Sequence, residues 1–163
     1  MKKPTQILSD EHKNILTVID SLLRKCDGLE GGEEINDDFF RRAIEFIRKY
    51  ADKFHHAKEE DVLFVKISGH SRMHCDPTKQ MLHEHEIGRG FVKGMEESLG
   101  KKDKKTLCEN ARGYGELLRD HIFKEDNILY PMADEALSES EQKEVAEKFS
   151  QVQDLAFDEK EWS

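Results

Sequence analysis

The chain has 163 residues, a length that suits one domain with a buried core. Apolar residues make up 36% of it and charged residues 37%, a balance typical of amphipathic helices with solvated outer faces. The formal net charge of −9 argues against nucleic acid or an anionic membrane as a partner. The sequence contains no apolar run of membrane-spanning length and no apolar N-terminal segment, so we expect neither a membrane span nor a signal peptide, and a cytoplasmic location.

Apolar residues recur at intervals of three and four along five segments, which predicts five helices. In chain order we expect them at about residues 5–27, 36–65 and 76–100, from about 103 to the region of Pro131, and at about 139–157. Asn36 is a plausible N-cap of the second helix, and Ser138 begins a capping box with the glutamate three residues later. Pro131 is expected to kink the fourth helix or to end its regular hydrogen bonding.

The first four helices are long, and the connections between them are short, which favours antiparallel neighbours. We therefore expect an all-α fold, an up-down-up-down antiparallel four-helix bundle over residues 1–135. An additional short C-terminal helix, within residues 136–163, is expected to pack on the same domain. The alternative role for this helix is a contact in a homodimer.

Two ten-residue strings, residues 55–64 and 121–130, resemble one another at an offset of 66 positions. Each begins with histidine, carries lysine three and glutamate four positions later, and ends in leucine followed by an aromatic residue. On a helix, side chains four positions apart leave the same face one turn apart. The repeat predicts that the second and fourth helices hold equivalent positions and that each presents a histidine and a glutamate to the bundle interior.

Four histidines and two glutamates interrupt the inward apolar stripes of the four long helices. They are His12, His55, Glu59, His85, His121 and Glu125. A buried carboxylate without a partner is expensive, so we expect cations to offset the two glutamates. Imidazole and carboxylate ligands without thiolate suit iron best, with manganese or zinc as lesser options. We expect the carboxylates to bridge two such ions, leaving coordination positions for a hydroxide and a small ligand such as dioxygen.

The register of the second helix leaves an alternative open. His56 and Glu60 form a second pair four residues apart, rotated by one position from His55 and Glu59. The 66-residue offset favours His55 and Glu59 as ligands, because His121 has its glutamate four residues later. His56 and Glu60 are then expected to support the ligands or to face solvent.

The ligands of the third and fourth helices also leave a choice. On the third helix His83 competes with His85, and the spacing of the apolar residues favours His85. On the fourth helix Asp126 lies five residues after His121, and it replaces Glu125 as the ligand if a π-bulge changes the register there.

These motifs resemble the hemerythrin-like (HHE cation-binding) domain family over about residues 5–135. The resemblance is carried by Asp10-Glu11-His12, by the histidine and paired glutamates of residues 55–60, by Glu84-His85, and by the histidine, lysine and glutamate of residues 121–125. It implies a four-helix bundle around a non-heme di-iron centre, in which two Fe ions are bridged by two carboxylates and an oxo or hydroxo group. Family functions include reversible dioxygen binding, oxygen or redox sensing, iron handling and responses to nitric oxide.

The third helix departs from the dioxygen-carrying members, which place two histidines four residues apart where this sequence has Met81, His85 and Arg89. One imidazole fewer argues against simple oxygen carriage. The leading hypothesis is a protein that binds or senses dioxygen, nitric oxide or peroxide, with a separate signalling or redox partner if it is a sensor. Competing hypotheses are a di-iron oxidase, peroxidase or nitric oxide reductase, an iron-handling or stress-repair protein, and a metal-free bundle that acts by contacts alone.

Overall fold

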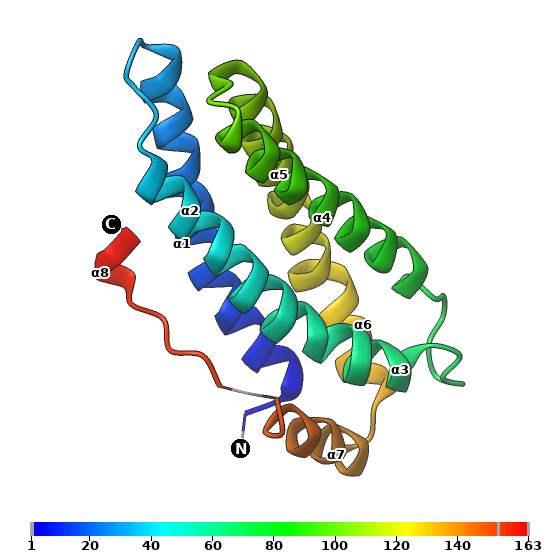
Figure 1. Cartoon of the computed structure of the whole chain (residues 1–163). Helices are drawn as coiled ribbons and strands as arrows, with labels where there is room; N and C mark the ends of the chain where they lie inside the picture. The colour runs from blue at the N-terminus through cyan, green and yellow to red at the C-terminus, as the bar shows by residue number, and fades with distance from the viewer. Residues whose placement is uncertain (1, 153, 163) are drawn as a thin grey trace.

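Four long helices form an antiparallel bundle in the computed structural model, which describes residues 2–152 and 154–162 (Figure 1). The first is α1 (Pro4–Glu30) and the third is α4 (Thr78–Gly100). The second runs through α2 (Asp37–Phe46), η1 (Ile47–His56), η2 (Glu59–Leu63) and α3 (Phe64–Ile67), and the fourth through α5 (Lys104–Lys124), η3 (Glu125–Leu129) and α6 (Tyr130–Ala136). The label η marks π-helical segments, whose backbone hydrogen bonds span one residue more than in an α-helix. The expected all-α, up-down-up-down bundle is confirmed.

Local capping determines where the helices begin. The Asn36 side chain accepts a hydrogen bond from the backbone N–H of Phe39 at 3.2 Å, and Asp103 accepts one from the N–H of Thr106, also at 3.2 Å. Between α1 and α2 the chain turns at Gly32, whose φ of 104° lies in the left-handed region that glycine tolerates best. None of the described helices is both long and apolar enough to cross a membrane.

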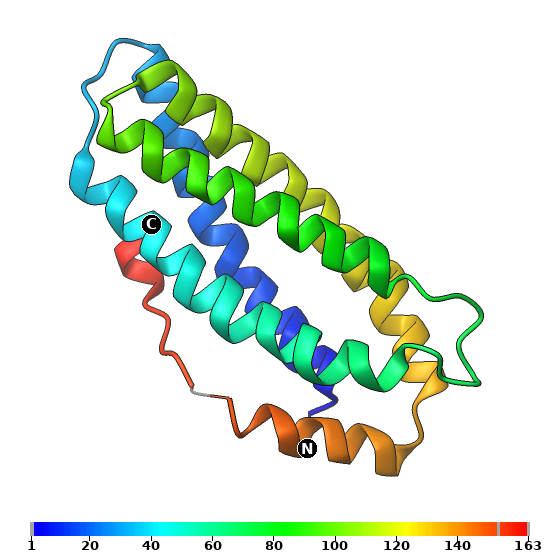
Figure 2. The ribbon, with the colours of Figure 1, turned by 45° about the vertical axis from the view of Figure 1, so that its right-hand side comes forward.

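The C-terminal part differs from the expectation of a helix over residues 139–157. Helix α7 (Glu139–Phe149) starts with the expected capping box at Ser138 but ends at Phe149. The chain then continues without helix over the described residues 154–158 and ends in the single turn α8 (Glu159–Trp162). Figure 2 shows this segment running beside the first two helices of the bundle. Aromatic packing explains the difference, because Phe157 and Trp162 lie against the ring of Phe46, with centroids 5.6 and 5.8 Å away.

The fourth helix continues beyond Pro131. Its regular α-helical hydrogen bonding is interrupted at η3, and Pro131 then occupies the first turn of α6, where its missing N–H is tolerated. The second helix is interrupted at the equivalent residues, η2, although Val65 occupies the position that matches Pro131, so the proline is not the cause of the interruption. The expected end of the helix at Pro131 is not found either, because α6 continues to Ala136.

The apolar core consists of two clusters with a polar layer between them. The larger cluster includes Ile15 and Val92, and the smaller includes Leu8 and Met81. Along α1, His12 lies between Leu8 of the smaller cluster and Ile15 of the larger; along α4, His85 lies between Met81 and Val92 in the same way. The expected metal-ligating residues therefore occupy one layer across the bundle, closed by apolar packing on both sides.

Trp162 fixes the C-terminal segment to the bundle. Its ring packs edge-on to Phe39, with centroids 5.8 Å apart, and the Arg42 guanidinium lies 5.7 Å from the ring centroid. The Ser21 hydroxyl donates a hydrogen bond to its carbonyl oxygen. With 4% of its surface exposed, Trp162 is part of the core.

We predict that Trp162→Ala lowers the free energy of unfolding by about 3 kcal/mol, because it removes a buried aromatic side chain. Urea unfolding followed by circular dichroism measures the change. Glu161→Ala is the matched control, since its exposed ion pair with Arg42 contributes no more than about 1 kcal/mol. Similar small losses in the two variants would contradict the packing described for Trp162.

Candidate metal centre

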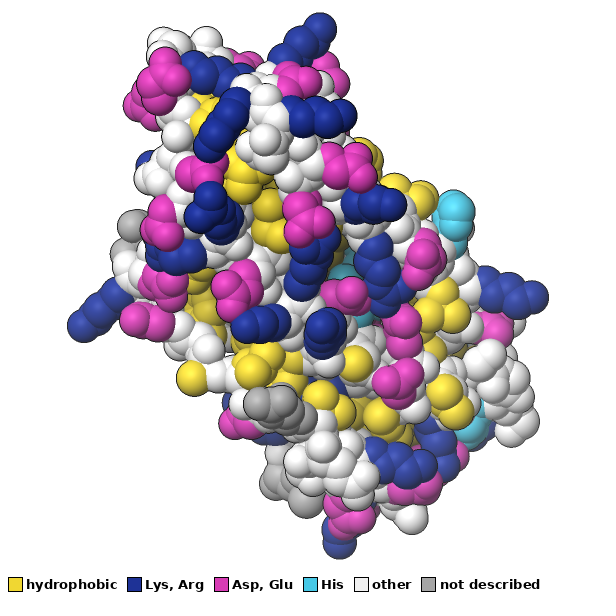
Figure 3. All heavy atoms as spheres, viewed as in Figure 1, with side chains coloured by type: hydrophobic (Ala, Val, Ile, Leu, Met, Phe, Trp, Pro, Cys, Tyr) yellow, Lys and Arg dark blue, Asp and Glu magenta, His cyan; other side chains and the backbone are white. Residues whose placement is uncertain are grey.

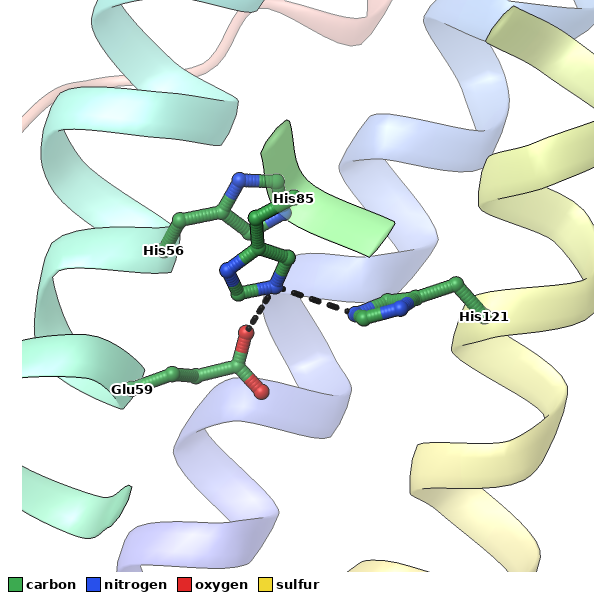
Figure 4. A group of neighbouring side chains, drawn as sticks. All are labelled: His56, Glu59, His85 and His121. Carbon is green, nitrogen blue, oxygen red and sulfur yellow. Dashed lines mark hydrogen bonds and ion pairs between the residues drawn. The ribbon is translucent and has the colours of Figure 1, made fainter. Parts of the chain in front are cut away.

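Seven buried side chains from all four long helices meet in the polar layer. They are His12, His55, His56, Glu59, His85, His121 and Glu125. Ligand atoms of His56, Glu59, His85 and His121 all lie within 4.8 Å of one another. Figure 4 shows these four side chains pointing toward one another from three helices. Ligand atoms of His12, His55 and Glu125 form a second group by the same measure. The layer thus offers two adjacent positions at which a cation has three or four possible ligands.

The two glutamates lie between imidazoles from different helices. Oε1 of Glu125 is 3.2 Å from Nε2 of His12 and 3.2 Å from Nε2 of His121. Oε1 of Glu59 is 3.4 Å from Nε2 of His85 and 3.6 Å from Nε2 of His55. Each carboxylate therefore faces imidazole groups of both ligand groups, which is the placement that a bridging carboxylate requires.

Several of these inward atoms lack a hydrogen-bond partner within the described part of the chain. They are Nε2 of His55, Oε1 of Glu59, and both carboxylate oxygens of Glu125. A buried polar atom without a partner costs about 1–3 kcal/mol, and more if it carries charge. These imidazole nitrogens and carboxylate oxygens face the centre of the layer. Cations at that centre would give each of them a partner.

Carboxylates on the outer side hold four of the imidazole rings in this orientation. The Nδ1-to-oxygen distances are 2.9 Å for His12 to Asp126, 2.9 Å for His55 to Glu11, 2.7 Å for His85 to Glu60 and 2.8 Å for His121 to Glu84. A carboxylate at Nδ1 fixes the proton there and leaves Nε2 as the ligand atom. Four Nε2 atoms are thus directed inward before any cation binds.

The outer carboxylates follow the two-fold repeat of the sequence. Lys58 donates to Glu11 at 2.6 Å, and Lys124, at the equivalent position of the fourth helix, donates to Glu84 at 2.5 Å. Each of these glutamates directly precedes the metal-layer histidine of its own helix and supports a histidine of another helix. The repeat therefore extends from the sequence to the hydrogen bonds around the layer.

His56 was expected either to support the ligands or to face solvent, and the structure shows that it does not face solvent. Its side chain is buried, its ring stacks on that of His85 with centroids 3.7 Å apart, and Nδ1 lies 3.6 Å from a carboxylate oxygen of Asp52. The π-helical backbone of η1 explains this position, because its larger number of residues per turn brings consecutive side chains closer in direction. His55 and His56 can then both point toward the interior. The sequence contained a signal for this position of His56. Asp52 lies four residues before it, so its carboxylate is on the same helix face and can hold the imidazole.

His83 and Asp126 both lie outside the set of inward ligand atoms. His83 is exposed, whereas His85 lies in the layer. Asp126 follows directly on Glu125 at the start of η3, but its carboxylate contacts Nδ1 of His12, and it is Glu125 that lies among the inward atoms. All six residues expected as ligands are brought together, and His56 adds a fifth imidazole that α-helical spacing does not predict. The count of one imidazole fewer, inferred from the third helix, is therefore corrected by the second helix.

The second and fourth helices differ at two positions beside the metal layer. The position of His56 is taken by Ile122 in the fourth helix, and that of Tyr130 is taken by Phe64 in the second. The Tyr130 hydroxyl donates to Oε2 of Glu59 at 2.8 Å, and its ring stacks on that of His12. The second helix therefore contributes an additional imidazole, and the fourth contributes a phenol that contacts Glu59 of the second helix.

The charges of the metal-free layer follow from burial and from the carboxylates. Burial lowers the pKa of His12, but the carboxylates of Asp126 and Glu125 outweigh it and raise the pKa to about 10. Burial likewise lowers the pKa of His85, and the two glutamates of the second helix raise it to about 9. Burial lowers the pKa of His56 to about 3. At pH 7 His12 and His85 are thus positively charged and offset the inward carboxylates.

From these pKa values we predict that cation binding strengthens as the pH rises from 6 to 9. His12 and His85 are protonated below their raised pKa values, and a cation that binds Nε2 must displace those protons. Titration with Zn²⁺ in buffers of different ionisation enthalpy should show the release of on the order of two protons per chain at pH 7. Zinc affinity that stays constant over this range would contradict the protonation states described.

The family comparison agrees with this geometry. The family model for the hemerythrin HHE cation binding domain matches residues 3–133, which include all four long helices up to α6 and every residue of the layer. No curated protein matches the chain. Since the match spans most of the sequence and the side chains at its centre form a cation-binding set, the chain belongs to the hemerythrin HHE cation-binding family.

Proposed function

We propose that the polar layer holds two iron ions and that the loaded protein binds dioxygen or another small oxidant, such as nitric oxide or peroxide. The observation that carries this proposal is the set of buried atoms that is unpaired only toward its own centre. Five imidazoles and two carboxylates around two adjacent positions are a ligand set for two cations rather than for one.

The donor chemistry favours iron over other metals. The layer offers nitrogen and oxygen atoms, whereas Cys26 and Cys108 lie in the larger apolar cluster and Cys75 is exposed. Imidazole with carboxylate suits iron, and manganese or zinc are the lesser options. Bound iron would supply the redox chemistry, and the chain supplies the oriented Nε2 atoms, the carboxylates and a layer closed by apolar packing.

The burial of the layer limits the size of the ligand. Its seven side chains are at most 5% exposed, and apolar clusters cover it on both sides. Only a molecule of a few atoms can reach such a site without opening the bundle. This argues for a diatomic or triatomic ligand and against an extended organic substrate.

One observation favours a second candidate function, a redox enzyme of the oxidase, peroxidase or nitric oxide reductase type. The Tyr130 phenol lies within hydrogen-bond distance of Glu59 and stacks on His12, so an oxidisable side chain is adjacent to the proposed ions. A Tyr130→Phe variant that still binds iron but turns over fewer oxidant molecules per chain would support the enzyme.

The proposed centre is tested by loading the protein with Fe²⁺ under anaerobic conditions and recording its metal content and visible spectrum before and after exposure to air. We expect two irons per chain, one for each ligand group, and absorption bands of a bridged ferric pair in air. A ligand band that disappears on degassing would indicate reversible binding, and irreversible oxidation would indicate sensing or turnover. A protein that takes up no iron would refute the proposal.

We also predict that His56→Ala weakens iron binding by at least about tenfold, because it removes one of the imidazoles that face the layer. His83→Ala is the matched control, since this histidine is exposed on α4. Iron binding is measured by competition with a chelator of known affinity. If His56→Ala binds iron as tightly as the control, His56 supports the ligands without binding iron itself.

A further inference from the structure

A small cavity lies beside the metal layer, between the second, third and fourth helices. Its volume is about 60 Å³, and its wall includes the rings of His56 and His85. Ile47, Gly88 and Val92 form apolar parts of the wall. A water molecule takes roughly 30 Å³ in the liquid, so the cavity has room for about two waters or for one molecule of two or three heavy atoms.

The Tyr114 hydroxyl gives this cavity a specific hydrogen-bonding group. Tyr114 is 2% exposed and lines the cavity from α5. Its hydroxyl has no hydrogen-bond partner among the described residues, although a buried phenol normally finds one. A donor without a partner, on a residue that lines a cavity of this size, would be satisfied by a small guest that accepts a hydrogen bond.

Charged side chains lie at the outer side of the cavity. The Arg89 guanidinium donates to Asp52 at 2.8 Å and to Glu60 at 2.6 Å, and the Arg89 side chain is 35% exposed. Arg48 and Asp52 also line the cavity, so a path of polar groups leads from the surface toward Tyr114. On this face of the molecule, Figure 3 shows histidine side chains visible between basic and acidic ones.

The fourth helix and the first lack the counterparts of these polar groups. At the positions equivalent to Asp52 and His56 the fourth helix has Leu118 and Ile122. Arg89 follows His85 by four residues on the third helix, and the residue four after His12 on the first helix is Leu16. The cavity and its polar path therefore belong to one half of the bundle. The second ligand group, which consists of His12, His55 and Glu125, forms without such a cavity or polar path. Holding a cation therefore does not require them.

We propose that this cavity is the site where a small hydrogen-bond acceptor of two or three heavy atoms is held on its way to the metal centre, with the Tyr114 hydroxyl as its donor. The inference rests on the proposed iron-binding function. It assigns Tyr114 a positioning role, and it assigns the side of the bundle from which the ligand arrives.

Two substitutions test the proposal with little effect on the fold. Tyr114→Phe removes the hydroxyl without breaking a hydrogen bond within the described chain. Gly88→Ala adds a methyl group whose nearest neighbours, including Cε1 of Tyr114, are at the ordinary contact distance of 3.7 Å. The methyl group takes roughly the volume of one water molecule from the cavity.

The probe is azide, and the measurement is its association rate constant with iron-loaded, air-oxidised protein in a stopped-flow spectrophotometer. We expect Tyr114→Phe to slow association by about three- to tenfold, the effect of one neutral hydrogen bond. Gly88→Ala should slow it by about tenfold, because the methyl group takes about half the space. Iron content is measured alongside and should equal that of the wild type.

The matched controls are Tyr50→Phe, which removes a buried hydroxyl outside the cavity, and Gly90→Ala, whose added methyl group meets no atom within 4 Å. Both should bind azide at the wild-type rate. If Tyr114→Phe and Gly88→Ala also leave the rate unchanged, the cavity holds water only and the proposal is wrong.

A metal-free measurement separates this proposal from the proposed function. Crystals of the metal-free protein soaked in azide should show azide within hydrogen-bond distance of the Tyr114 hydroxyl in the wild type and none in Gly88→Ala. Wild-type crystals without azide there would overturn the cavity as a holding site, whether or not the protein binds iron. A chain that binds azide at this position but takes up no iron would overturn the proposed function and leave the holding site standing.

Discussion

Two carboxylates without exposed surface, Glu59 and Glu125, lie in the interior of an otherwise apolar helical bundle. Burying such groups is unfavourable unless cations or protons offset their charge. In the metal-free protein, protonated imidazoles do so, because the carboxylates around His12 and His85 raise the pKa of both rings. The layer therefore carries its own countercharge, while several of its inward nitrogen and oxygen atoms make no hydrogen bond within the described part of the chain. Bound cations would replace the protons and satisfy the same atoms.

The orientation of the ligands depends on charged side chains that are not themselves ligands. Glu11 and Glu84 each hold an imidazole of a neighbouring helix, and each is held in turn by a lysine. These contacts follow the two-fold repeat, so the repeat encodes both the inward groups and the outer groups that aim them. Where the repeat breaks, at His56 and Tyr130, the two halves acquire different chemistry. Both differences lie outside the six residues that the sequence predicts as ligands.

Much of this arrangement could be predicted from the sequence, because helix periodicity, caps and the His-xxx-Glu spacing are local signals. The six inward residues were expected at the bundle interior for that reason, and the structure brings them together. The direction of His56 could not be predicted from α-helical spacing, since it depends on the π-helical hydrogen bonding of η1. The end of α7 at Phe149 was also missed, because the path of the chain beyond it follows tertiary packing of Trp162 rather than local propensity.

The most direct test of the account is the position of iron in crystals of the loaded protein, measured from anomalous scattering at the iron absorption edge. We predict two anomalous peaks in the polar layer. One should lie among His56, Glu59, His85 and His121, and the other among His12, His55 and Glu125. Peaks elsewhere on the chain, or a loaded protein whose layer shows no peak, would contradict the central claim that this layer is a two-cation site.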